Sequence, residues 1–276
     1  MQHVLTRAGR VAYSDGGSGP PIVLLHATLH DHRDFDAIAP ALRDDHRVIA
    51  VDWPGHGASD APSPSRAVTA TLLADVLEDL VAALDLPVCA LIGNSVGGYA
   101  ASRLAIRQPA RVAALVLVNA AGFTPNNRAT RTFCRAMGTP AITRRLLPRL
   151  VPRYMKPGNE LDRAITARTV ARARTADGVA LAASLWRSFA DPAYDLRSEA
   201  SQHTARTLFV WGERDVVLPP RAGRSAHRAL PSSQFATLET GHVAFASDPH
   251  GFLTLIRPFL AGSFSAQTSP DTAIDG

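Results

Sequence analysis

The sequence predicts an α/β fold: a doubly wound, mostly parallel β-sheet with helices on both faces and a helical lid inserted between two strands. Three observations lead to this prediction. Short β-branched runs alternate with amphipathic segments, several runs are apolar at nearly every position, and residues 123–199 show helical periodicity without any strand pattern. Continuous apolar strands are typical of a parallel sheet that helices cover on both sides.

The regular elements follow from this alternation of patterns. In residues 67–84, Leu72, Val76, Leu80 and Leu84 recur at fourfold spacing, which predicts one buried helical stripe. Residues 95–108, 161–176 and 219–230 are also expected to be helical. Seven segments have the composition of strands: residues 11–14, 22–26, 48–52, 88–93, 112–118, 208–211 and 235–238.

The order of these elements suggests how the chain is divided. Residues 1–122 and 201–262 are expected to form one core domain, because α/β folds of roughly 250 residues are often single units. Residues 123–200 are too many for a loop, and they are expected to form the helical lid. Residues 263–276 are rich in Ser, Thr, Asp, Gly and Pro, which predicts a disordered tail.

The charge of the chain is unevenly distributed. The net charge is +5, yet residues 125–200 hold 14 basic and 6 acidic residues, whereas the rest of the chain holds 15 and 18. A basic lid could attract an anionic substrate or an acyl carrier. Solvated helix faces in an arginine-rich chain would have the same composition, so both interpretations stay open. Basic and aromatic residues do not interleave, and we expect no nucleic-acid partner.

Two further features concern the cellular context. The N-terminal residues lack the apolar stretch of a secretory signal, and no run of about 20 apolar residues is present. We therefore expect a cytoplasmic protein without a membrane partner. The two cysteines, Cys89 and Cys134, are too few for a disulfide framework or a metal site, and we expect both to be inert small hydrophobes.

A glycine-rich turn carries the first candidate catalytic residue. The segment Gly-Asn-Ser95-Val-Gly-Gly follows an apolar strand and precedes a helical run. A nucleophilic serine in such a turn is held in a strained conformation that exposes its hydroxyl. The residues two before and two after it approach each other closely, which Gly93 and Gly97 permit. The N-terminus of the following helix also directs free N–H groups and a positive dipole toward a developing oxyanion.

A serine nucleophile needs a base, and that base needs an acceptor that fixes its tautomer. His242 lies just past the last predicted strand and Asp215 just past the preceding one. Both are therefore expected at the carboxyl edge of the sheet, where ligands bind in open α/β folds. Glu213, two residues before Asp215, is the alternative acid.

Four separated motifs now agree in order and spacing. They are His26-Ala27 after an early strand, the loop from Asp52 to Asp60, the turn at Ser95, and the acid and histidine loops. With them the chain resembles the α/β-hydrolase superfamily from about residue 11 to residue 260. The resemblance implies an eight-stranded sheet and a Ser95–His242–Asp215 triad without a metal or cofactor.

The resemblance also implies an oxyanion hole built from the backbone N–H groups of Val96 and Thr28. The family usually has glycine after the histidine of this loop, whereas this chain has Ala27. The nearby run of histidines and an aspartate, from His26 to His32, matches no metal signature. We expect a structural His26 with exposed neighbours.

The expected reaction is cleavage of an ester-like bond, in a carboxylester, lactone or thioester, through an acyl-enzyme on Ser95. A serine at this position argues against the family members that use an aspartate nucleophile, the haloalkane dehalogenases and epoxide hydrolases. The substrate is expected to be a small, partly apolar molecule. The residues expected to contact it are Leu29, Phe123, Trp186 and Val243, with Leu146 and Leu147 as further lid residues.

Two alternatives remain at this point. Hydrolases that cleave carbon–carbon bonds in aromatic ring-fission products have a similar Gly-Asn-Ser turn, but they typically place tryptophan after the histidine, where this chain has Val243. The second alternative belongs to another class of protein: a small-molecule receptor in which the triad is slow or vestigial.

Overall fold

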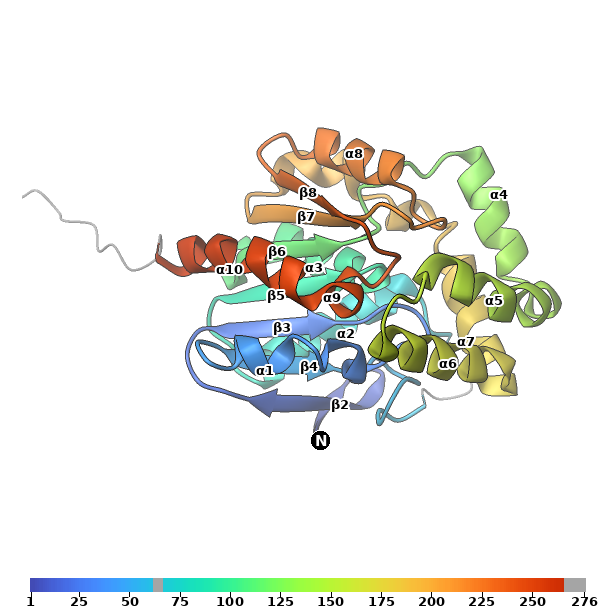
Figure 1. Cartoon of the computed structure of the whole chain (residues 1–276), viewed down its shortest axis with the longest axis horizontal. Helices are drawn as coiled ribbons and strands as arrows, with labels where there is room; N and C mark the ends of the chain where they lie inside the picture. Colours follow the sequence, from blue (N-terminus) through green and yellow to red (C-terminus); the bar gives the residue numbers. More distant parts are fainter. Residues whose placement is uncertain (62–66, 266–276) are drawn as a thin grey trace, which may run out of the picture.

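An eight-stranded sheet forms the centre of the molecule (Figure 1). The computed structural model describes residues 1–61 and 67–265. The strand order is β1-β2-β4-β3-β5-β6-β7-β8; β1 and β2 are antiparallel to their neighbours, and the strands from β4 to β8 are parallel. The predicted doubly wound, mostly parallel sheet is confirmed. The strands are β1 Gln2–Thr6, β2 Gly9–Gly16, β3 Pro21–Leu25, β4 Arg47–Val51, β5 Cys89–Asn94, β6 Val112–Val118, β7 Arg206–Gly212 and β8 Gln234–Leu238.

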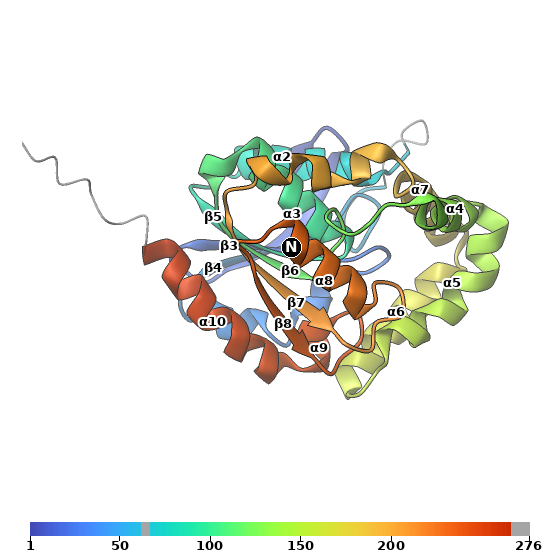
Figure 2. The same cartoon turned by 90° about the horizontal axis from the view of Figure 1, so that it is seen from above.

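Helices cover both faces of the sheet. Figure 2 shows α2 (Ala70–Ala83) and α3 (Val96–Arg107) on one face and α10 (Pro249–Ser265) on the other. Helix α1 (Ala39–Leu42), labelled in Figure 1, packs beside β4. Helix α8 (Pro220–Ala229) packs on β7 and β8. Because both faces are covered, every residue of β3, β5 and β6 is buried, which accounts for their continuous apolar sequences.

Four helices lie between β6 and β7 in the sequence. They gather at one end of the sheet, on the right in Figure 1. Asparagine or threonine side chains accept a hydrogen bond from the first turn of three of them, which fixes where each begins. The helices are α4 Arg128–Met137, α5 Pro140–Met155, α6 Glu160–Arg174 and α7 Ala176–Ser188, followed by the short 3-10 helices η3 Pro192–Tyr194 and η4 Leu196–Gln202.

The C-terminal helix extends further than the sequence indicated. Residues 263–265 belong to α10, and Ser263 is buried with its hydroxyl donating to the Phe259 carbonyl. The prediction that the tail begins at residue 263 is therefore wrong for these three residues. The remainder of that prediction, residues 266–276, lies outside the described residues. Within residues 1–61 and 67–265, no helix has the length and apolarity needed to cross a bilayer.

Candidate active site

Ser95 lies in the tight turn between β5 and α3, with φ 55° and ψ −117°. A non-glycine residue in this region is strained, and it persists only where the surroundings determine it. Here the Ser95 N–H donates to the Val118 carbonyl at 3.1 Å. A methyl group on Gly93 would lie 2.6 Å from the Gly97 carbonyl oxygen, so only glycine permits this close approach of strand and helix. The sequence predicts this strained turn, and Ser95 lies half-buried in it at the edge of a pocket.

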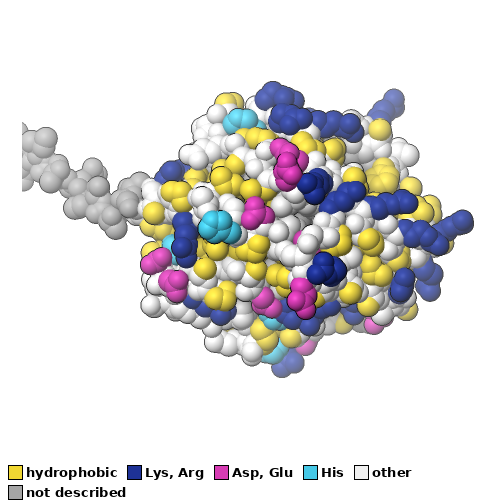
Figure 3. Space-filling model, in the orientation of Figure 1, with side chains coloured by type: hydrophobic (Ala, Val, Ile, Leu, Met, Phe, Trp, Pro, Cys, Tyr) yellow, Lys and Arg dark blue, Asp and Glu magenta, His cyan; other side chains and the backbone are white. Residues whose placement is uncertain are grey.

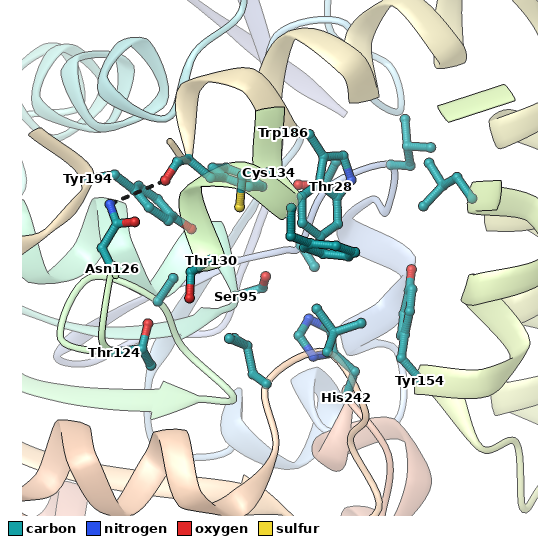
Figure 4. Close-up of a pocket in the computed structure, with 18 of the residues that line it drawn as sticks. Thr28, Ser95, Thr124, Asn126, Thr130, Cys134, Tyr154, Trp186, Tyr194 and His242 are labelled. Atoms are coloured by element: carbon teal, nitrogen blue, oxygen red, sulfur yellow. Dashed lines mark hydrogen bonds between the residues drawn. The ribbon is translucent and has the colours of Figure 1, made fainter. Parts of the chain in front are cut away.

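His242 and Asp215 meet at the carboxyl edge of the sheet. Asp215 follows β7, His242 follows β8, and the His242 Nδ1 donates to Asp215 Oδ2 at 2.6 Å. Both side chains are buried. Glu213, the alternative acid, is exposed to solvent. The bond at Nδ1 fixes the imidazole tautomer and leaves Nε2 as the nitrogen that can accept a proton. Figure 4 shows the ring beside Ser95 at the pocket.

Asn119, directly after β6, holds the carboxylate of Asp215. Its Nδ2 donates to Asp215 Oδ2 at 2.7 Å, and its Oδ1 accepts from the Gly212 N–H at 2.9 Å. The other carboxylate oxygen accepts from the N–H groups of Val217 and Leu218. The sequence analysis missed Asn119, although a polar residue directly after an apolar strand is a signal that could have identified it.

The histidine loop is held from two sides. The Asn94 side chain donates to the His242 carbonyl at 3.0 Å. On the other side, the His242 N–H donates to the Tyr154 carbonyl at 3.0 Å, and the two rings meet edge to face at 5.2 Å. Burial raises the pKa of Tyr154 well above its usual value, so its phenol stays neutral. Tyr154 lies at the end of α5, and no local pattern in the sequence connects it to His242.

The loop after β3 is fixed by two buried histidines. His26 Nδ1 donates to the Ala27 carbonyl, while its Nε2 accepts from the Trp53 N–H. His56 Nε2 accepts from the N–H of Leu29, at 3.0 Å, in a turn where Leu29 has φ 66°. Burial lowers the pKa of His56 to about 3, so at neutral pH it is uncharged and can act as this acceptor. These contacts hold the loop although it has alanine where glycine is usual.

The two predicted oxyanion donors remain available. Neither the Thr28 N–H nor the Val96 N–H donates to an acceptor within the described part of the chain. The next N–H along the loop, that of Leu29, is already bonded to His56. Thr28 lines the same pocket as Ser95, and Val96 is the first residue of α3, where helices leave N–H groups free.

The neighbours of His26 differ from the prediction. His26 is buried and bonded within the loop, as expected of a structural residue, but His30 and Asp31 are buried rather than exposed. The inserted helices cover them: Arg168 of α6 forms an ion pair at 3.1 Å with Asp34, which also bonds His30 Nδ1. The described residues contain no group of three or more His, Cys, Asp or Glu side chains suited to a metal ion.

A cavity of about 120 Å³ opens beside Ser95 and His242 (Figure 4). Of the predicted substrate contacts, Leu29 and Trp186 line it, together with Leu147. Cavities of roughly 150 Å³ can hold a benzene ring, so the space fits a small organic group.

Three other residues expected near the substrate lie outside this cavity. Phe123 is buried in the core, where its ring meets His203 edge to face at 5.7 Å. Val243 is buried at the start of α9 (Ala244–Ser247). Leu146 faces solvent on the outer side of α5. The sequence could identify these residues as apolar, but the side of the element on which each lies depends on tertiary packing.

Comparison with known proteins assigns the family. The sequence model of the family described as alpha/beta hydrolase fold matches residues 20–249, so the chain belongs to this family. An uncharacterized protein of Mycobacterium tuberculosis is 31% identical over 281 residues, covering 94% of this chain and 79% of its own length.

Esterases are among the similar proteins. Pimeloyl-[acyl-carrier protein] methyl ester esterase of Nitrosospira multiformis is 27% identical over 254 residues, which cover 88% of this chain and 95% of the esterase. A thermophilic esterase from Thermogutta terrifontis superimposes with a TM-score of 0.80 at 25% identity, covering 95% of this chain and 99% of the esterase.

Proposed function

We propose that the protein is a serine hydrolase that cleaves an ester-like bond of a small, partly apolar substrate through an acyl-enzyme on Ser95. The observation that carries this proposal is that three features lie together at one site. They are the strained Ser95 turn, the His242–Asp215 hydrogen bond of 2.6 Å, and two backbone N–H groups without an acceptor among the described residues. The esterases among its relatives support the same class of reaction.

In the proposed mechanism, His242 Nε2 removes the proton of the Ser95 hydroxyl as its oxygen attacks the substrate carbonyl. The negative charge that develops on the carbonyl oxygen is stabilised by the N–H groups of Val96 and Thr28. His242 then gives the proton to the leaving alcohol or thiol, and Asp215 stabilises the imidazolium in between. Water, activated by His242, attacks the acyl-enzyme and releases the acid. The steps require no metal or cofactor.

The inserted helices are proposed to act as the lid that sets specificity, and their outer surface is basic. Residues 125–156 contain eight basic residues and no acidic one. Figure 3 shows Lys and Arg side chains gathered on the side of the molecule where α5 lies. Arg144, Arg145 and Arg149 are exposed there. This surface supports an anionic partner outside the pocket, such as an acyl carrier, for a thioester or ester substrate.

The test compares the wild type with Ser95→Ala on p-nitrophenyl butanoate. We expect kcat/KM to fall by roughly 10⁴-fold or more, because removing a triad nucleophile eliminates the covalent route. Near-UV circular dichroism of both proteins controls for folding. Equal turnover by the two proteins would contradict the proposal. Absence of turnover in both, with a small molecule bound tightly in the pocket, would favour the receptor alternative.

A further inference from the structure

Apart from Thr28, Tyr154 and the proposed catalytic residues Ser95 and His242, the pocket has a polar wall. Thr124, Asn126, Thr130 and Tyr194 line it on the side of Ser95 that lies away from Tyr154 (Figure 4). The rest of the lining is mainly aromatic and aliphatic, with Phe133, Leu147, Trp186 and Phe189 contributed by the inserted helices and the residue after them. A small set of placed polar groups in an apolar pocket is the usual means of orienting a ligand.

The orientation of the Asn126 amide is set by two backbone carbonyls. Its Nδ2 lies 3.4 Å from both the Phe189 and the Asp191 carbonyl oxygens. A carbonyl oxygen can only accept, so the amide nitrogen must face this pair and the amide oxygen must face the other way. The bond to Phe189 is drawn in Figure 4, where the amide nitrogen faces the carbonyl oxygen.

That amide oxygen lacks a donor. Asn126 Oδ1 is buried and has no hydrogen-bond partner within the part of the chain that the structure describes. The neighbouring hydroxyl of Thr130 is already engaged with the Pro125 carbonyl and the Asn127 side chain. Most buried polar atoms in folded proteins have a partner, so an orphaned acceptor in a ligand pocket indicates the chemistry of the ligand.

The ligand group that meets Asn126 Oδ1 must be a hydrogen-bond donor, and the composition of the pocket lining determines whether that donor can carry a charge. Among the described residues that line it there is no Arg, Lys, Asp or Glu. An ionised substrate group would therefore be buried without a partner of opposite charge, which is unfavourable. The group that meets Asn126 must be a neutral donor, a hydroxyl or an amide N–H.

We propose that Asn126 is a specificity-determining residue that selects substrates whose reacting moiety carries a neutral hydrogen-bond donor. Ser95 and Asn126 line one cavity of about 120 Å³, so the donor and the scissile carbonyl belong to one small group. This inference rests on the proposed function of Ser95 for its kinetic test. A site that hydrogen-bonds a substrate group discriminates against the analogue without it, because the buried partner is then left unpaired.

The kinetic test uses the p-nitrophenyl esters of butanoic, 3-hydroxybutanoic and 3-formamidopropanoic acids, with rates corrected for spontaneous hydrolysis. We expect the wild type to favour the hydroxyl or the amide ester over butanoate by about tenfold in kcat/KM, which one hydrogen bond supplies. In Asn126→Leu this ratio should fall to about one. Comparison of the two donor-bearing esters shows whether the site prefers a hydroxyl or an amide N–H as the donor.

The control variant is Thr132→Leu, at an exposed position of α4 outside the pocket, which should keep the wild-type ratio. Absence of any preference in the wild type would overturn the inference even if Asn126→Leu failed to fold. An undiminished preference in Asn126→Leu would also overturn it.

A binding arm separates this inference from the proposed reaction. If no ester is cleaved in a Ser95-dependent manner, the hydrolase proposal fails, and the Tm shifts caused by benzyl alcohol and by toluene are compared instead. A larger shift with benzyl alcohol in the wild type, lost in Asn126→Leu, supports the donor-binding role of Asn126. Equal shifts with the two ligands in the wild type contradict it.

Discussion

At the scale of single residues, the proposed catalytic groups depend on side chains that are not themselves part of the motifs. Asn119 holds Asp215 through its Nδ2, and Tyr154 holds His242 through its carbonyl and its ring. His56 holds the N–H of Leu29 and so fixes the loop that carries Thr28. Each of these contacts uses a buried polar group with a defined partner, which restricts the pocket to one arrangement.

His56 should make the protein less stable in acid. Its pKa is about 3 in the folded state because of burial, against about 6.5 in an unfolded chain. Between pH 6.5 and about 3 only the unfolded state binds this proton, so the free energy of unfolding falls by about 1.4 kcal/mol per pH unit as pH decreases. Above pH 6.5 the residue contributes no pH dependence.

The measurement is urea unfolding of the wild type and His56→Gln between pH 4 and 6.5. Glutamine keeps an acceptor for the Leu29 N–H but does not titrate. We expect the free energy of unfolding to depend less steeply on pH in the variant than in the wild type, by about 1.4 kcal/mol per pH unit. Identical slopes in the two proteins would show that His56 is not buried in its neutral form.

At the scale of elements, the junction of β5 and α3 tolerates no side chain at Gly93. An added methyl group would lie 2.6 Å from the Gly97 carbonyl oxygen and 2.7 Å from the Gly98 Cα, both of them backbone atoms that cannot turn aside. Gly93→Ala should therefore lower the free energy of unfolding by about 3 kcal/mol, the usual range for overpacking. Chemical denaturation measures the change.

Gly158→Ala is the matched control for this prediction. A methyl group there has no atom within 4 Å, and the residue has no positive φ. We expect its free energy of unfolding to change by no more than about 0.5 kcal/mol. Equal effects of the two substitutions would contradict the close approach of strand and helix at the Ser95 turn.

The elements of the core could be predicted closely because their patterns are local. Residues 95–108 were expected as a helix, and α3 runs from Val96 to Arg107. The edge strand β1 was missed because only Thr6 of its five residues is buried. The predicted helix at 161–176 is interrupted at Thr175, which ends α6 and caps α7 with its hydroxyl. Helical periodicity continues across such a break and does not reveal it.

At the scale of the whole molecule, the family fold brings the proposed catalytic residues to one edge of the sheet, and the inserted helices contribute part of the pocket lining. The order of motifs was enough to predict Ser95, His242 and Asp215 as neighbours, because parallel strands bring their carboxyl ends to one edge. The pocket wall could not be predicted in the same way. Asn126 is held at the pocket by the Phe189 and Asp191 carbonyls, and Tyr154 by the His242 N–H, so these contacts join residues far apart in the sequence.

The central claim is that Ser95 is the nucleophile, and labelling with a fluorophosphonate tests it most directly. The folded protein is treated with the probe, digested, and mapped by mass spectrometry. We expect one adduct, on Ser95, that is lost in Ser95→Ala and slowed in Asp215→Asn, because the asparagine no longer stabilises the His242 tautomer that activates the serine. An adduct at another residue, or none in a folded wild type, would contradict the account.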